Sequence, residues 1–202
     1  MNKRPRRPAQ IDPEQVEYLT GEPDPAESSE ISHAAAQALI PTDSRQRIDD
    51  DVRDRILALI EEEGIDLVAE AWVRAPSDTL GGVLWRGYLL SEWIRREPDD
   101  VARRYAASKS VAEADGAESP VTPGEIKKRW DDVFAGHGQD GFAELLRDSA
   151  TLANFLGDLD AVWISSDNHS LATLVTRRND ALLETSKELA IGAISFNEGR
   201  LD

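Results

Sequence analysis

The chain has 202 residues, a net charge of −16 and no cysteine, so disulfides, thiolate metal sites and cysteine nucleophiles are excluded. No run of about 18 uncharged apolar residues predicts a membrane span, and so acidic a body repels nucleic acid at long range. Because no apolar segment follows the basic start of the chain, we expect a cytoplasmic protein without a membrane partner, and because arginine far outnumbers lysine, a bacterial one. The length suffices for one core that buries roughly 70% of the unfolded surface.

Residues 1–41 predict a mobile N-terminal arm with short helices. Residues 1–10 carry four bases, two prolines and no acid, and such a segment cannot bury enough apolar surface to order itself. It either stays solvated or binds an anionic partner or the protein's own acidic body. Pro13 can open a short helix that ends near Leu19, with apolar side chains available for docking. A small helix is also predicted over 30–40, and residues 42–202 are predicted to form a single helical domain.

Residues 47–63 are predicted to form a helix, and they are rich in acidic side chains. From 47 to 63 apolar residues recur every three or four positions and predict one buried stripe: Ile48, Val52, Ile56, Leu59 and Ile60. Three glutamates, Glu61, Glu62 and Glu63, fall in the last turn, where the helix dipole disfavours negative charge. A basic neighbour would relieve this repulsion, as would simple hydration.

The main apolar element is predicted over residues 77–97, after a short helix at 66–74. Apolar side chains occupy most of the circumference of this central helix, so neighbours have to cover it on several sides. Gly81, Gly82 and Gly87 each weaken a helix by about 1 kcal/mol relative to alanine. Their presence therefore predicts that neighbouring elements approach this helix closely.

Further helices are predicted after the central one. Pro98 fits the first position of a helix that is expected to end near residue 108. Residues 109–122 lack periodicity and predict a surface connection, which is a candidate border between two subdomains. Thr122 has capping-box spacing to Glu125, with proline at the first helical position, and starts another helix. The apolar run 161–164 is too short to distinguish a strand from a turn of helix.

The last helix is predicted over 167–197. Its apolar side chains recur at alternating spacings of 4 and 3 residues, as in a heptad seam with Arg178, Thr185 and Gly192 as weak members. We favour packing inside a helical bundle, with a homodimer through this helix as the alternative. Together the patterns predict an all-α bundle of about seven or eight helices around the central apolar helix.

Aromatic residues and arginines gather at the C-terminal half of the central helix and in the helix after it. Such side chains are typical of protein-interface hot spots, can stack on bases, and also occur in cores where arginine stems cover the rings. We select six candidate partner-binding residues: Arg86, Trp93, Arg95, Arg96, Arg103 and Arg104. Since no nucleotide-loop, serine-hydrolase or zincin pattern is present, the leading prediction is a non-enzymatic interaction or regulatory module with an unidentified protein partner and no cofactor. Nucleic-acid association through the basic start of the chain and these arginines is a disfavoured alternative.

A second candidate function is a Mg²⁺-dependent hydrolase of nucleotides, with Asp50, Asp51 and Asp54 as metal ligands. Carboxylates one helical turn apart can hold Mg²⁺ with help from a neighbouring helix. The pattern Asp51-x-x-Asp54, followed by Glu97-x-x-Asp100, is similar to the paired acidic motifs of the all-helical nucleotide pyrophosphohydrolases of the MazG/dUTPase type. In that family the first motif begins with two glutamates, and the two motifs are closer together in sequence. In this chain Pro98 also interrupts the second acidic pair.

Overall fold

The structure is a computed structural model that describes residues 25–42, 48–138, 140–158 and 172–201, of which 25–27 and 172–178 are described by their backbone alone. Over these ranges the chain forms eight α-helices, one short 3-10 helix and no strand, so the predicted all-α fold is confirmed. The predictions for residues 1–24, for 161–164 and for the first residues of the last helix lie outside the described residues. None of the described helices is long and apolar enough to cross a membrane.

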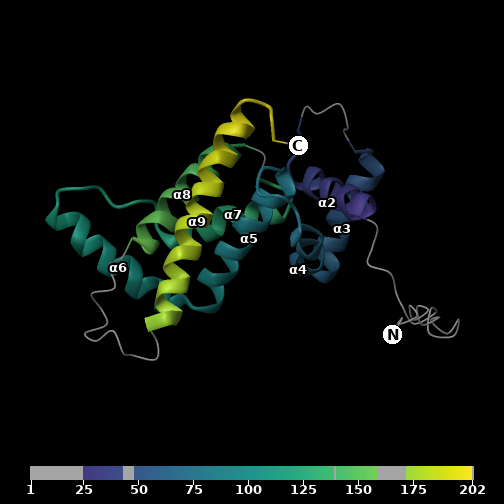
Figure 1. The fold of residues 1–202 in the computed structure, drawn as a ribbon. Coiled ribbons are helices and arrows are strands. Elements are labelled where there is room, and N and C mark those ends of the chain that lie inside the picture. The colour runs from purple at the N-terminus through teal and green to yellow at the C-terminus, as the bar shows by residue number, and fades with distance from the viewer. Residues whose placement is uncertain (1–24, 43–47, 139, 159–171, 202) are drawn as a thin grey trace, which may run out of the picture.

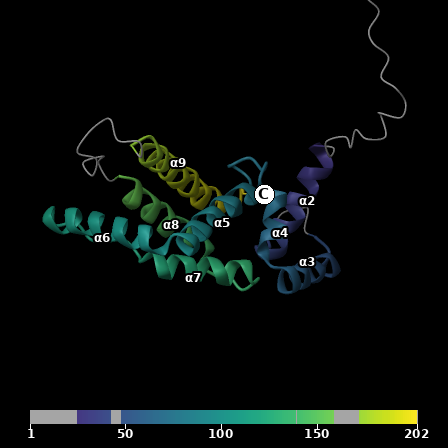
Figure 2. The ribbon, with the colours of Figure 1, turned by 90° about the horizontal axis from the view of Figure 1, so that it is seen from below.

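The helices divide into two ends and a middle (Figures 1 and 2). In chain order they are α2 (Pro25–Leu39), α3 (Asp50–Glu63), α4 (Ile65–Ala69), the 3-10 turn η1 (Glu70–Trp72), α5 (Leu80–Arg96), α6 (Pro98–Ala114), α7 (Pro123–Phe134), α8 (Phe142–Gly157) and α9 (Ala172–Asn197). Helices α2, α3 and α4 lie together at one end of the molecule. Helices α5, α7, α8 and α9 form the middle, and α6 extends to the other end.

Helix α5 is the central element, as the sequence predicts. Thr79 caps it, since its hydroxyl oxygen accepts a hydrogen bond from the amide of Gly82 at 3.1 Å. Helices α2, α7 and α9 all contact α5. The buried side chains of α5 include Leu80, Val83, Leu84, Leu90 and Ile94.

The glycines of α5 confirm the predicted close approach of neighbours. A Cβ atom on Gly87 would overlap the indole ring of Trp130 in α7, and one on Gly82 would overlap the carbonyl of Pro76. A Cβ atom on Gly81 would lie 2.6 Å from the hydroxyl of Ser32 in α2. The glycines therefore lower the helix propensity of α5 but allow neighbouring elements to pack more closely against it.

Helix α2 belongs to the packed core, whereas its sequence falls in the stretch 1–41 that predicts an arm. Leu39 and Ile40 at its end are buried. The indole N–H of Trp72 in η1 donates to the carbonyl of Ser32 at 3.2 Å, and Trp72 is itself fully buried. The part of α2 from Ser32 to Leu39 is thus fixed to η1 and α5.

The predicted buried stripe of α3 is wrong in part. No residue of α3 is fully buried, and Val52 and Leu59 are 39% and 37% exposed. Leu57, which the periodicity did not select, packs against the core together with Ile60. The reason is position: α3 lies at the edge of the molecule against α2 and α4, so only one narrow side of it is covered.

Helices α6 and α7 begin where the sequence predicts. Pro98 occupies the first turn of α6, and the Thr122 hydroxyl oxygen accepts from the amide of Glu125 at the start of α7. However, α6 continues to Ala114, so the predicted connection 109–122 is shorter than expected. Alanine, lysine and glutamate in this stretch are good helix formers, and they extend the helix despite the lack of an apolar stripe.

Helices α8 and α9 form an antiparallel pair. Phe142 at the start of α8 packs edge-on against Phe196 at the end of α9, with ring centroids 5.0 Å apart. The hydroxyl of Ser186 donates to the carbonyl of Ala150, and a Cβ atom on Gly192 would lie 2.8 Å from Val83 of α5. The described part of the heptad seam therefore packs within the bundle, which was the favoured prediction.

Candidate functional site: an acidic groove and an arginine cluster

Arg86 connects two helices and is not a free surface residue. Its Nε and Nη2 atoms donate to the carboxylate of Glu188 in α9 at 2.6 and 3.0 Å, and both side chains are about one fifth exposed. The hydrogen bond from Arg86 lowers the pKa of Glu188 below its ordinary value, against the opposing effect of burial. Arg86 thus holds α9 to α5.

Arg104 has a similar structural role in α6. Its Nη1 atom donates to Oδ1 of Asn179 in α9 at 2.9 Å and to the carbonyl of Leu156 in α8 at 3.4 Å. Its Nε atom lies 3.4 Å from Asp100, and the side chain is only 11% exposed. Two of the six predicted contact residues, Arg86 and Arg104, are therefore occupied in joining helices.

Arg95, Arg96 and Arg103 remain on the surface, with side chains 52%, 64% and 73% exposed. Glu92 accepts from Arg95 at 2.6 and 2.7 Å and from Arg96 at 2.7 Å. These bonds, that from Arg95 foremost, lower the pKa of Glu92. Arg103 lies 3.2 Å from Asp100 in its own helix. We call Glu92, Arg95 and Arg96 the arginine cluster.

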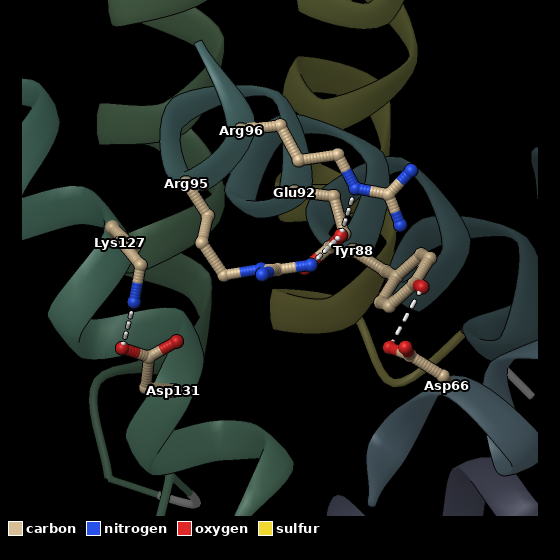
Figure 3. Close-up of polar contacts among 7 residues, drawn as sticks. All are labelled: Asp66, Tyr88, Glu92, Arg95, Arg96, Lys127 and Asp131. Atoms are coloured by element: carbon tan, nitrogen blue, oxygen red, sulfur yellow. Dashed lines mark hydrogen bonds and ion pairs between the residues drawn. The ribbon is translucent and has the colours of Figure 1, made fainter. Parts of the chain in front are cut away.

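A tyrosine connects the arginine cluster to α4. The hydroxyl of Tyr88 donates to Asp66 at 2.9 Å, and the two side chains lie on the α4 side of the cluster in Figure 3. Burial, and then the hydrogen bond to Asp66, raise the pKa of Tyr88 to about 12. On the other side Figure 3 shows Lys127 and Asp131 of α7, paired at 2.5 Å.

Trp93, the remaining candidate, lines a small apolar pocket between α5 and α9. The pocket measures about 180 Å³ and is also lined by Leu89, Leu90, Ala181, Leu182 and Thr185. Among the described residues the indole N–H of Trp93 has no acceptor. Trp93 packs against the core, so it contributes to the fold more than to an open surface.

A groove of about 780 Å³ lies between α3, the start of α4 and the end of α7. Figure 2 shows the C-terminal end of α7 approaching α3 and α4. The larger apolar side chains that line the groove, which we call its floor, are Leu57, Ile60, Ile65 and Phe134. A Cβ atom on Gly136, which has a φ of +80°, would lie 2.8 Å from Leu57, so the turn after α7 closes directly onto α3.

The rim of this groove is acidic. Asp54 and Glu61 of α3, Asp131 of α7 and His137 line the groove; we call these polar side chains its rim, and the whole the acidic groove. Among the described residues Asp54 and Glu61 form no ion pair, whereas Asp131 pairs with Lys127. Asp131 thus belongs to the rim and is also one of the residues drawn with the arginine cluster in Figure 3.

The three predicted metal ligands do not converge. Asp50, Asp51 and Asp54 are exposed on α3, and of these only Asp54 lines the groove. Over the described part of the chain, no group of three or more acidic or histidine side chains is arranged to hold a metal ion. Asp100, from the second acidic motif, lies against Arg103 and Arg104 instead.

Sequence reasoning did not find the acidic groove. Leu57 lies outside the predicted stripe, and Ile65 and Phe134 are, from sequence alone, ordinary apolar residues. The available signal was the unrelieved acidic last turn of α3, which carries no basic residue. Comparison of the chain with protein-family models, with curated proteins and with solved structures finds no match.

Proposed function

We propose that this protein is a non-enzymatic protein-interaction module that takes a basic, partly apolar segment of a partner into the acidic groove. The supporting observation is the combination of an apolar floor with carboxylates that lack a cation, Asp54 and Glu61. An apolar floor stabilises a ligand by removing its hydrophobic side chains from water. The rim selects for lysine or arginine next to those side chains, because it repels acidic segments.

We infer that the arginine cluster supplies a second contact, of the opposite charge. Arg95 and Arg96 are exposed and already share one carboxylate, Glu92, so they keep a net positive charge. A partner segment with bases at the groove and an acid beyond it would complement both parts. Of the six predicted partner-binding residues, this proposal includes Arg95 and Arg96.

Selection from a library of random displayed peptides tests the proposal. We expect enriched peptides to combine apolar residues with lysine or arginine and to bind the full chain saturably in fluorescence polarisation. Ala58→Arg places a bulky cation at an exposed position of α3 that lines the groove. It should weaken binding about tenfold or more, which corresponds to at least 1.4 kcal/mol.

The matched control is Ala190→Arg, which makes the same change at an exposed position in α9 away from the groove. This variant should bind the selected peptides as the wild type does. Equal loss in both variants would indicate non-specific charge attraction. Selected peptides that bind the Ala58→Arg variant as tightly as wild type would refute the groove as the contact site.

A further inference from the structure

We propose that two copies of this chain pair through the outward side of α9, with the two helices antiparallel and related by a twofold axis. The centre of this surface consists of Ile191 and Ile194, which are each 57% exposed although they are large and apolar. We call these two side chains the isoleucine patch. The proposal does not depend on the acidic groove, because no residue of α9 lines that groove.

The isoleucine patch lies on the side of α9 that faces away from the bundle. Figure 2 shows α9 at the margin of the middle helices, and α9 packs against α8 and α5. Leu189, which belongs to the predicted heptad seam, is fully buried on the inner side. Ile191 and Ile194 are three residues apart, so they are neighbours on one face of the helix. The patch is therefore a separate surface from the seam.

Charged side chains flank the isoleucine patch in a definite order along the chain. Glu184 and Lys187 precede it and pair with each other at 3.5 Å. Glu198 and Arg200 follow it and also pair with each other. All four side chains are more than half exposed, the least of them, Glu198, by 51%. The order is thus acid, base, patch, acid, base.

This order is complementary to itself only when the two helices are antiparallel. A twofold axis between Ile191 and Ile194 places each of them opposite the other residue in the second copy. Lys187 of one copy then lies opposite Glu198 of the other, because both are about 8 Å from the axis along the helix at 1.5 Å per residue. Glu184 likewise approaches Arg200. In a parallel pair each charge would meet its like, which disfavours that arrangement.

The local balance of charge also suits contact between two copies. The chain carries a net charge of −16, so most approaches of one copy to another are repulsive. Between residues 184 and 200 the exposed charges cancel, since two acids accompany two bases. The apolar centre is small, so we expect a weak, reversible dimer with a dissociation constant in the micromolar range or above.

Sedimentation velocity of the full chain over micromolar to millimolar concentrations tests the proposal. We expect the mass to rise with concentration from one chain toward two. Ile191→Glu and Ile194→Glu should each raise the dissociation constant about tenfold or more, which corresponds to at least 1.4 kcal/mol. The effect is expected to be large because a twofold interface contains each substitution twice.

The matched control is Ile31→Glu, which makes the same change at a position of α2 that is 55% exposed. This variant should dimerise as the wild type does, and circular dichroism should show that all three variants keep their helices. A mass of one chain at every concentration would overturn the proposal. Equal dimerisation of wild type and Ile191→Glu would also overturn it, as would equal loss in Ile31→Glu.

Disulfide trapping tests the orientation. The chain has no cysteine, so Ile191→Cys and Ile194→Cys each introduce a single thiol. When one variant is ¹⁵N-labelled and the two are mixed in equal amounts and oxidised, mass spectrometry distinguishes the mixed disulfide from the two symmetric ones. We expect the mixed disulfide to exceed its statistical proportion. An excess of the symmetric disulfides would indicate parallel helices and would overturn the antiparallel arrangement.

Failure of this inference can be told apart from failure of the proposed function. If the chain stays monomeric but binds the selected peptides, the inference is wrong and the interaction function stands. If it dimerises through α9 but binds no peptide, the proposed function is wrong and the dimer stands. Because α9 does not line the groove, the Ile191→Glu variant should bind the selected peptides as the wild type does.

Discussion

Gly87 of α5 lies against the fully buried ring of Trp130 in α7. That ring cannot move aside freely, because its N–H donates to the hydroxyl of Ser149 at 2.9 Å and it stacks on Phe134. An added methyl group therefore has to push two helices apart. The gain in helix propensity of about 1 kcal/mol from alanine is smaller than the cost of such overpacking.

We expect Gly87→Ala to destabilise the protein by about 1–3 kcal/mol. Gly124→Ala in α7 is the matched control, because nothing lies within 4 Å of a Cβ atom there. The control should be neutral or stabilising by up to about 1 kcal/mol, since alanine restricts the unfolded chain. Urea unfolding measures both, and an unchanged midpoint for Gly87→Ala would contradict the packing described here.

The Arg86–Glu188 pair should contribute measurably because it is bidentate and mostly buried. Arg86→Met is expected to cost about 1.5–3 kcal/mol, the range for hydrogen bonds to charged groups. Lys187→Met removes the adjacent, exposed pair with Glu184 and should change stability by less than about 0.5 kcal/mol. If the two substitutions had equal effects in chemical denaturation, the pair would have no special role.

The same pair predicts a dependence on pH. The pKa of Glu188 is lowered in the folded protein, so its contribution is fully present above the unfolded value of about 4.3 and is lost as the pH falls through the lowered pKa. The stability difference between wild type and Glu188→Gln should therefore shrink as the pH is lowered from about 5. A difference that stays constant over that interval would show that ionisation of Glu188 is irrelevant.

At the scale of elements, we expect α3 to open locally at a lower free energy than α5 and α8. It has no fully buried side chain, whereas α5 and α8 each bury many. Elements with few buried contacts open locally at a lower free energy than the core. In a hydrogen-exchange experiment, the amide hydrogens of α3 should therefore exchange well before those of α5 and α8. Equal protection of α3 and α5 would contradict this order.

Helix boundaries were predictable where a local signal determines them. Pro98 and the Thr122–Glu125 capping box mark the starts of α6 and α7 in sequence and in structure. The apolar circumference of α5 also predicted its central position correctly. These features depend on residues within a turn of one another, and a single sequence contains that information.

The roles of the arginines were not predictable in the same way. Arg86 resembles Arg95 in sequence, yet its carboxylate partner lies 102 residues away, and Arg104 meets Asn179 at a separation of 75. The acidic groove likewise depends on the meeting of Leu57 with the turn at Gly136. Such juxtapositions are products of the tertiary fold, and helical periodicity alone carries no information about them.

Across the whole molecule, the net charge of −16 should make stability depend on salt. Like charges repel in the compact state, and about 0.1 M salt shortens the screening length to about 10 Å. We expect Tm to rise with NaCl, by about 2–4 °C for each kcal/mol of repulsion that is relieved. A fall in Tm would show that ion pairs such as Arg86–Glu188 outweigh the general repulsion.

The connection between α5 and α9 through Arg86 and Glu188 also bears on the order of folding events. The α8–α9 pair joins neighbours along the chain, whereas the contact with α5 closes a loop of 102 residues, at a greater cost in chain entropy. The α8–α9 pair should therefore form early in folding and dock against α5 late. Stopped-flow kinetics of Arg86→Met should then show faster unfolding with nearly unchanged refolding, because the lost bond belongs to a step after the rate-limiting barrier.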